Sequence, residues 1–492
     1  MGTGEAWREA VYRKPMKKIL IYNWVPFDET ENKGGGVSVY TKNLIRHLIR
    51  RDDLEVYFLS SGRAYDIRKK GTFIEPSENI FGDKCRSFQI VNSPVLSSAR
   101  LSFTSLWREN EDVILKQVVR QFFLEEGGFD IVHFQNLEGL SLGVLALKEE
   151  FPGTRFIYSL HNYYPFCPGV TLWKADSHNC REKRCGEGCI GCMPGDVHRW
   201  KVILNQWINY RKQRGEQISP AWGLVQCMSE KACAVWDSRR DGKISVKKRK
   251  RLIKALRRFR EGNVTYLNRY MDLILAVSQR TAEIAADHGL EREKVVVSYI
   301  GTEAAENQKC ASAYPSDGNI LRICYLGYMR KEKGFQFLIE ALEKMPEQTA
   351  ERIDLTLAAK ITDQTMKKRI AGLRKRLAGV MVYDGYTHDR LPQILENVQL
   401  GIIPPLWEDN LPQVAIEMRA QGIPLLVSDA GGAKELTLSK EFVFAAGDVD
   451  DFISRLSALA ECPDKLADYW NSAPELTTME AHIRELAVYY GG

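Results

Sequence analysis

The sequence lacks the features of a membrane-spanning, secreted or repetitive protein. No apolar run approaches the roughly 18 residues that a membrane-spanning helix needs. The segment 1–14 lacks the apolar core of a secretory signal peptide. Low-complexity segments and short repeats are also missing. These absences favour a globular protein of the cytoplasm.

A strong charge of one sign is missing as well. The formal net charge is +6, from 69 Lys and Arg against 63 Asp and Glu, and the pI is near 8.6. Nucleic-acid-binding domains usually carry a larger basic excess, so the composition predicts no nucleic-acid partner. The chain has 492 residues, 44% of them hydrophobic and 27% charged, which is enough for at least two globular domains.

What the sequence does contain is a stretch from Trp407 to Glu435 with two acids and a diglycine. Seven residues separate Asp409 from Glu417, and an apolar strand, LLV, follows. If a helix begins at about Leu411, Pro412 lies in its first turn, where a missing N–H costs nothing. The acids then lie near the end of the helix that carries positive dipole. The stretch therefore predicts a polar site at the edge of an otherwise apolar α/β unit.

Two further patterns near the N-terminus suggest ligand contacts. Gly34, Gly35 and Gly36 lie between a predicted strand and a predicted helix, where glycine lets the backbone approach an anion. A flexible surface loop is the alternative explanation. His161 directly follows the strand RFIYSL, and ligands of open α/β sheets gather at the carboxyl ends of strands. A structural histidine that caps the strand is the alternative there.

These motifs together resemble the donor-site signature of the retaining GT-B glycosyltransferases, family 4-like (group 1). The family pattern is Glu, seven residues, Glu, then Gly-x-Pro, a strand and Gly-Gly-x-x-Glu. The corresponding residues are Asp409, Glu417, Gly422, Pro424, Gly431, Gly432 and Glu435. Only the first acid departs, with Asp in place of Glu.

The resemblance implies an α/β protein with the GT-B fold. Strands alternate with helices in both halves of the chain, as in two doubly wound parallel sheets. We expect two Rossmann-like domains that face a cleft, with a cysteine-rich and helical insertion in the first. The expected parts are an acceptor-side domain (1–302, insertion about 163–273), a linker (303–319), a nucleotide-sugar domain (320–474) and a helix that crosses back (475–492).

The resemblance also implies an activity and assigns site residues. It implies retaining transfer of a sugar from a nucleotide diphosphate sugar to a glycan or lipid-linked acceptor, in cell-surface polysaccharide or glycoconjugate synthesis, with no cofactor required for catalysis. The catalytic candidates are His161, Asp409 and Lys333. The candidate donor-binding residues are Gly35, Gly36, Arg330, Lys333, Gly385, Tyr386, Asn410, Leu411 and Glu417.

One phosphate-binding position departs from the family. Lys333 matches the family lysine, but Tyr328 occupies the position of the family arginine. Two phosphates need roughly two positive partners as the leaving group gains charge. We therefore expect Arg330, two residues after Tyr328, to supply the second cation.

A dense group of cysteines lies in the insertion. Cys180, Cys185, Cys189 and Cys192 form a C-x4-C-x3-C-x2-C pattern, with Cys167 upstream. Four thiolates so close in sequence can enclose a tetrahedral zinc ion, so a structural zinc site is one prediction. Free thiols, an iron–sulfur cluster and disulfides are the alternatives.

Two basic stretches, 198–214 and 245–262, follow the cysteines with helical periodicity. The second carries a set of nine cations: Lys247, Lys248, Arg249, Lys250, Arg251, Lys254, Arg257, Arg258 and Arg260. Such a helix can rest on an anionic membrane surface, which predicts peripheral contact with the inner face of the membrane. The alternative is a solvated helix that packs one stripe on its own domain.

Two other functions remain open from the sequence. A GT-B-fold sugar-nucleotide epimerase or hydrolase would use the same donor site without an acceptor. A non-catalytic protein could instead bind nucleic acid or an anionic membrane through its cysteine loop and basic helices. The donor nucleotide, the sugar and the acceptor stay undetermined, because specificity depends on pocket shape and a few hydrogen bonds.

Overall fold

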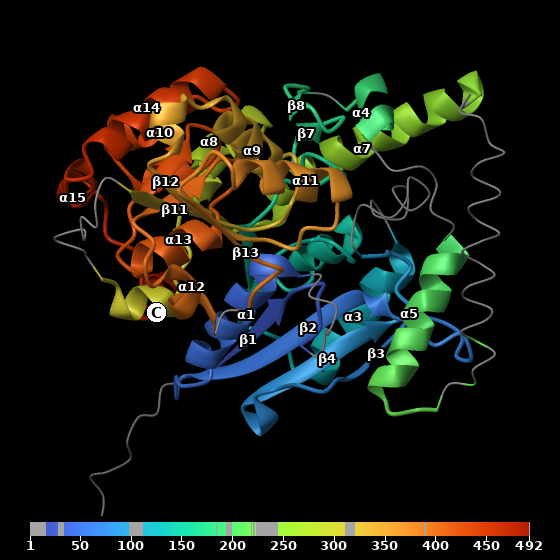
Figure 1. Ribbon diagram of the computed structural model, residues 1–492. Helices are drawn as coiled ribbons and strands as arrows, with labels where there is room; N and C mark the ends of the chain where they lie inside the picture. Colours follow the sequence, from blue (N-terminus) through green and yellow to red (C-terminus); the bar gives the residue numbers. More distant parts are fainter. Residues whose placement is uncertain are drawn as a thin grey trace, which may run out of the picture.

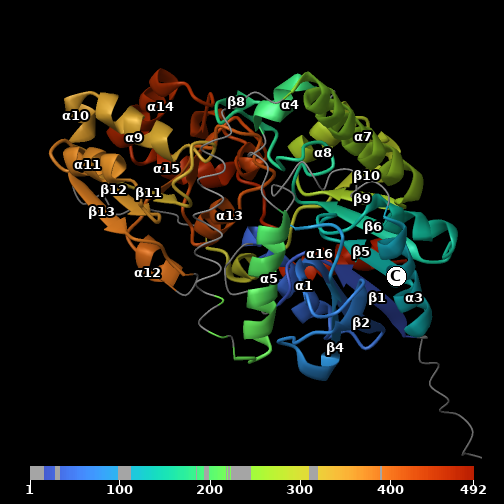
Figure 2. The same ribbon diagram turned by 90° about the vertical axis from the view of Figure 1, so that its right-hand side faces the viewer.

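Two parallel sheets, each with helices on its faces, make up the molecule (Figures 1 and 2). The computed structural model describes residues 16–27, 34–97, 112–183, 185–192, 199–217, 219, 222, 245–309, 320–387 and 390–491. Residues 310–319, most of the predicted linker, lie outside the described residues. The two sheets match the predicted pair of Rossmann-like domains.

The N-terminal sheet has eight strands in the order β10-β9-β6-β5-β1-β2-β4-β3. All neighbours pair in parallel except β3 and β4. The strands are β1 Lys17–Tyr22, β2 Leu54–Ala64, β3 Phe73–Pro76, β4 Cys85–Val91, β5 Ile131–Phe134, β6 Arg155–Leu160, β9 Leu273–Ala276 and β10 Val295–Val297.

Strand β1 shows why this sheet lies in the interior. Ile19 and Ile21 pack into one hydrophobic cluster, whereas Leu20 and Tyr22 pack into another. All four are buried, so both faces of the strand are covered. A strand buried on both faces reads as a continuous apolar run, which is the pattern of KKILIY.

Helices of the N-terminal domain connect these strands. The α-helices are α1 Gly35–Leu48, α3 Val113–Glu125 and α8 Gln279–Asp287, and the 3₁₀ helices are η1 Gly82–Lys84, η3 Leu142–Glu149, η4 Arg292–Lys294 and η5 Glu303–Asn307. The start of α8 is fixed by Ser278, whose hydroxyl accepts a hydrogen bond from the Thr281 N–H. This helix start lies close to the C-terminal domain, as described below.

The described residues of the insertion form a short hairpin and three helices. They are β7 Trp173–Lys174, β8 His178–Asn179, α4 Glu187–Cys192, α5 Arg199–Gln213 and α7 Val246–Tyr270. The two basic stretches are therefore helices, as predicted. Figures 1 and 2 both show α4 alongside α7. The buried residues of α7 lie from Leu256 onward, so its first three turns are largely exposed.

The C-terminal sheet has six parallel strands in the order β13-β12-β11-β14-β15-β16. They are β11 Leu321–Leu326, β12 Ile353–Ala358, β13 Gly379–Tyr383, β14 Leu400–Ile403, β15 Leu425–Ser428 and β16 Val443–Phe444. The helices are α9 Phe335–Lys344, α10 Glu347–Ala350, α11 Gln364–Leu373, α12 Leu391–Leu395, α13 Gln413–Ala420, α14 Val449–Glu461 and α15 Lys465–Asp468, with 3₁₀ helices η7 Ala433–Leu436, η8 Lys440–Phe442 and η9 Tyr469–Asn471. The site lies at the carboxyl ends of β11 and β14.

The last helix, α16 (Met479–Tyr489), returns to the N-terminal domain and packs against α1 (Figure 2). The hydroxyl of Tyr40 in α1 lies 2.7 Å from Nε2 of His482. Just beyond the helix, the hydroxyl of Tyr490 lies 2.8 Å from Nδ1 of His133 in β5. The end of the chain thus supplies part of the N-terminal core.

In the part of the chain that the structure describes, we find no helix with the length and apolarity to cross a bilayer.

The buried His133 predicts a loss of stability in acid. Burial, with smaller effects of His161 and His482, lowers the pKa of His133 to about 3. The unfolded chain therefore binds a proton between about pH 6.5 and pH 3 that the folded chain excludes. The free energy of unfolding should fall with pH in that window, by at most about 1.4 kcal/mol per pH unit from this residue.

Urea unfolding of the wild type and of His133→Gln at several pH values measures this contribution. The variant should lose part of the acid slope, whereas the exposed His178→Gln should keep all of it. Equal slopes in wild type and His133→Gln would show that the residue is not the source.

Candidate active site

A cleft of about 540 Å³ lies between the two domains. Its size is that of a small-molecule site. The N-terminal domain contributes Gly35, Gly36, Val37, Val39, His161, Val277 and Ile300 to its lining. The C-terminal domain contributes residues of the loops after β11, β13 and β14 and of the start of α13. All of the predicted catalytic and donor-binding residues except Arg330 line this cleft.

The glycine loop reaches the cleft at the start of α1. Gly35 has φ of 53°, a conformation that favours glycine. A Cβ on Gly36 would lie 2.8 Å from Oε1 of Gln413 in the other domain. The Gln413 side chain also donates a hydrogen bond to the Gly36 carbonyl, at 2.9 Å. These glycines therefore allow a close contact between the domains as well as an approach to a ligand.

The diglycine turn (Gly431 and Gly432) lies directly against the acid loop (residues 406–410). The N–H of Gly432 donates to the Asp409 carbonyl at 2.7 Å. Gly431 has φ of 71°, and a Cβ there would lie 2.2 Å from the Asp409 carbonyl oxygen. Only glycine allows this approach, which explains why a diglycine accompanies the acid pair.

Asp409 forms an ion pair with Lys333 inside the cleft. The distance from Lys333 Nζ to Asp409 Oδ2 is 2.7 Å, and the Asp409 side chain is 9% exposed. The Lys333 ammonium also lies over the ring of Trp407, 4.9 Å from its centroid. Two predicted catalytic residues, Lys333 and Asp409, are therefore in direct contact. The Trp407 ring partly shields the lysine from water.

His161 lies on the opposite side of the cleft, at the end of β6. Its Nε2 is 3.0 Å from Oε1 of the buried Gln135, and the Tyr40 ring packs against it. Burial, with a smaller effect of His482, lowers the pKa of His161 to about 3. The imidazole is thus neutral near pH 7 and is able to donate or accept a hydrogen bond.

Glu417, in α13, lines the same cleft, as do Tyr386 and Gly385. Burial and the Glu417 carboxylate raise the pKa of Tyr386. Helix α13 begins at Gln413, two residues later than predicted, because Pro412 has an extended ψ of 119° and serves as the N-cap residue. Asn410 and Leu411 precede it, and both line the cleft.

Arg330 does not lie with the other predicted residues. Its side chain is 54% exposed, 3.7 Å from the Glu332 carboxylate, and its guanidinium packs over the Tyr328 ring. Tyr328, at the position of the family arginine, lines the cleft instead.

Two interdomain contacts at the edge of the site were not predicted from the sequence. Arg280 in α8 makes two hydrogen bonds to the Glu408 carboxylate, at 2.9 and 2.7 Å. Burial of Glu408 opposes ionisation, but the Arg280 contact prevails and lowers the pKa of Glu408. Glu435 accepts hydrogen bonds from the N–H groups of Gln279 and Arg280, both at 2.8 Å, at the start of α8. Glu435 was visible as a motif residue, but only the packing reveals its partner.

The structure does not support the predicted zinc site. Within the described ranges, no group of three or more His, Cys, Asp or Glu side chains is arranged to hold a metal ion. Cys180, Cys185, Cys189 and Cys192 form no disulfide. Cys185 is buried and hydrogen-bonded to Cys189, and this contact lowers the pKa of Cys189. Cys167, Cys180, Cys185 and Cys189 pack against the N-terminal hydrophobic core.

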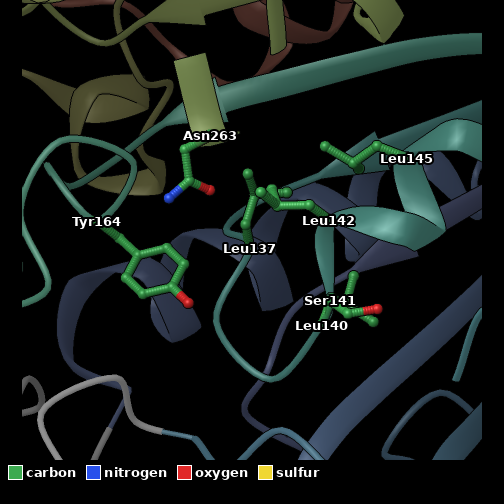
Figure 3. A pocket seen from close by; sticks show the side chains of 7 residues that line it. All are labelled: Leu137, Leu140, Ser141, Leu142, Leu145, Tyr164 and Asn263. Atoms are coloured by element: carbon green, nitrogen blue, oxygen red, sulfur yellow. The ribbon is translucent and has the colours of Figure 1, made fainter. Parts of the chain in front are cut away.

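A second, buried cavity lies under α7 and η3 (Figure 3). Its volume is about 10 Å³, roughly the space of one water molecule. Leucines form most of its wall, with Ser141, Tyr164 and Asn263. It is too small for a substrate.

Two family models match the chain. Residues 308–475 match the model for glycosyl transferases group 1, and residues 34–207 match the model for glycosyltransferase family 4. The two matches cover most of both domains. A search of curated proteins finds no significant match.

Solved structures share the fold along almost the whole chain. Anabaena Alr3699/HepE, solved with UDP-glucose, is 15% identical with a TM-score of 0.54, over 96% of this chain and 99% of that one. The trehalose-phosphate synthase of Burkholderia xenovorans is 12% identical, with a TM-score of 0.56 over 97% and 100% of the two chains. The sucrose-phosphate synthase of Thermosynechococcus elongatus is 12% identical, with a TM-score of 0.55 over 96% and 98%. At these identities the likeness establishes the GT-B fold.

We expect Gly431→Ala to destabilise the protein by about 2–4 kcal/mol, because the new Cβ meets the Asp409 backbone at a positive φ. Gly372→Ala is the matched control, since Gly372 lies in α11 with nothing within 4 Å of the added Cβ. Denaturant unfolding of both variants measures the difference. A Gly431→Ala protein as stable as the control would contradict the close packing described here.

Proposed function

Because the chain belongs to the group 1 and family 4 glycosyltransferases, which transfer sugars from nucleotide sugars with retention, we propose that it uses a UDP-hexose donor and a glycan or lipid-linked acceptor. The product would enter cell-surface polysaccharide or glycoconjugate synthesis on the cytoplasmic side of the membrane. The observation that carries the proposal is the Lys333–Asp409 pair in one cleft with His161 and Glu417.

The diphosphate of the donor would lie between the glycine loop and Lys333. The backbone N–H groups at the start of α1 can donate to phosphate oxygens, because the first N–H groups of a helix have no partner within it. Lys333 adds a positive charge, which stabilises the negative charge that develops on the diphosphate as it leaves. In this proposal Arg330 supplies the second cation after its side chain turns away from Tyr328.

The sugar would lie between Asp409 and His161. The transition state of a retaining transfer resembles an oxocarbenium ion, so a nearby carboxylate stabilises the positive charge that develops on the ring. The neutral His161 would donate or accept a hydrogen bond to a sugar hydroxyl. Lys333 contacts Asp409, and we propose that it shifts toward the phosphates when the donor binds.

Glu417 would hold the ribose of the donor. A carboxylate accepts hydrogen bonds from two vicinal hydroxyls. Glu417 shares the cleft with Tyr386 and Gly385, which we assign to the nucleotide base. Asn410 and Leu411 would add contacts from the start of α13. UDP is the proposed nucleotide because Alr3699/HepE was solved with UDP-glucose and the Burkholderia enzyme is described as UDP-forming.

The exposed first turns of α7 support an acceptor at an anionic surface. Residues Lys247, Lys248, Arg249, Lys250, Arg251, Lys254, Arg257 and Arg258 are exposed, and residues 246–258 contain no acid. A basic helix of this kind binds anionic lipid headgroups by about 1 kcal/mol per cation near the surface. We therefore propose a lipid-linked acceptor, with α7 resting on the membrane.

A calorimetric screen against UDP-, GDP-, ADP- and TDP-sugars tests the donor. We expect micromolar binding of a UDP-sugar by the wild type, and about 10- to 100-fold weaker binding by Glu417→Gln, which loses charge-assisted hydrogen bonds to the ribose. Glu343→Gln, on α9 and bound to Arg369, is the control and should bind as the wild type does.

If no sugar nucleotide binds the wild type, the transferase proposal fails. If a UDP-sugar binds but is only hydrolysed or epimerised with every acceptor offered, the donor site stands and the acceptor proposal is wrong.

For Lys333→Met we expect kcat/KM for sugar transfer to fall by about 100- to 1,000-fold. The variant removes the cation at the leaving diphosphate and leaves the Asp409 carboxylate without its partner. Lys344→Met, which removes an exposed lysine at the end of α9, should change kcat/KM less than twofold. Steady-state kinetics with the donor identified by calorimetry gives both values, and similar kinetics in the two variants would remove Lys333 from the site.

A further inference from the structure

The side chain of Asn179, in the cysteine-containing insertion, contacts the backbone of the acid loop. Its Nδ2 donates to the Leu406 carbonyl at 3.0 Å, and its Oδ1 accepts from the Glu408 N–H at 3.1 Å. These two peptide groups flank Trp407. A single carboxamide therefore forms the same two backbone hydrogen bonds that a neighbouring strand would form. Asn179 is 227 residues from Leu406 in the sequence and 229 residues from Glu408.

The residues on either side of this contact belong to the proposed donor site. Trp407 packs edge-on against Tyr163 and supports the Lys333 ammonium. Asp409 is the next residue after Glu408 and holds Lys333. A displacement of the peptide at Glu408 would thus move Trp407 and Asp409 together. Glu408 itself is also bound by Arg280 and by the Gly431 N–H, at 3.0 Å.

The hairpin that carries Asn179 is held in a defined shape. Ala175 and Asp176 have φ of 47° and 53°, and the Ser177 N–H donates to the Lys174 carbonyl at 3.0 Å. This is a type I′ turn formed without glycine, a conformation that needs support from its surroundings. The support includes the Ala175 N–H, which donates to Sγ of Cys192 at 3.3 Å.

The base of the hairpin is tied to the thiols as well. The Cys180 N–H donates to the Leu172 carbonyl. Cys180 follows Asn179 directly and packs on the core with Cys167, Cys185 and Cys189. The hairpin and the cysteines thus form one support for the Asn179 side chain.

We infer that Asn179 is a positioning residue of the sugar-transfer reaction, and that the cysteine-containing insertion serves to hold Asp409 and Trp407 at the donor sugar. The inference rests on the proposed function. Asn179 does not line the cleft, so it acts through the acid loop and not by touching the donor. The nucleotide contacts at Glu417, Gly385 and Tyr386 lie outside the acid loop, so loss of Asn179 should affect the sugar more than the nucleotide.

Asn179→Ala and Asn179→Leu test the inference. The alanine variant removes the carboxamide, whereas the leucine variant keeps a side chain of similar size without hydrogen bonds. We expect kcat for transfer to fall at least 10-fold in both, with the Kd for UDP unchanged within twofold. His178→Ala, the exposed neighbour on the same strand, is the control and should match the wild type.

A double-mutant cycle with Asp409→Asn separates positioning from a general structural role. If Asn179 acts through Asp409, Asn179→Leu should lower kcat by less than twofold in the Asp409→Asn background. Wild-type kcat in Asn179→Leu, or a full and additive loss in the cycle, would overturn the inference. Weakened UDP binding in both Asn179 variants would do the same. Failure of the wild type to bind any sugar nucleotide would instead count against the proposed function.

Discussion

The close contact between the acid loop and the diglycine turn is the constraint on which the rest of the site depends. It brings the Asp409 backbone within hydrogen-bonding distance of Gly432, with no room for a side chain on either glycine. Because the diglycine turn fixes the backbone of the loop, the Asp409 side chain is held in the cleft although it is largely removed from water. The ion pair with Lys333 then compensates for a charge that burial alone would disfavour.

The same loop also joins the domains. Glu408 binds Arg280 in α8, and Glu435, just after the diglycine turn, binds the first N–H groups of the same helix. Helix α8 is therefore held by two carboxylates of the C-terminal domain, at the end where a helix favours negative charge. Together with the Gln413–Gly36 hydrogen bond, these contacts hold the cleft in one geometry.

Much of the fold and part of the site could be predicted from the sequence, for physical reasons that differ between the residues. Strands such as RFIYSL are buried on both faces and read as apolar runs, so the end of β6 and the position of His161 follow from local pattern. Lys333 and the diglycine belong to short motifs with fixed spacing.

The remaining features depend on contacts between distant segments. Arg280 and Glu408 are separated by 128 residues, and neither carries a local signal of its partner. Arg330 was predicted to bind the diphosphate because it is a cation close to the position of the family arginine. In the structure its side chain lies at the surface, where it contacts the Tyr328 ring and the Glu332 carboxylate. The cysteine spacing is compatible with a metal, with disulfides or with free thiols, because spacing fixes the separation of backbone positions and not the direction of the sulfur atoms.

Helix α16 gives the molecule a particular order of assembly. Tyr40 and its partner His482 are separated by 442 residues, so the ribosome makes one side of this buried contact long before the other. Until α16 arrives, the face of α1 that it covers and the His133 side chain have no native partner from the chain end. The N-terminal domain is thus synthesised before the C-terminal domain but completed after it. During synthesis, the apolar surface that α16 later covers is open to chaperones or to a wrong partner.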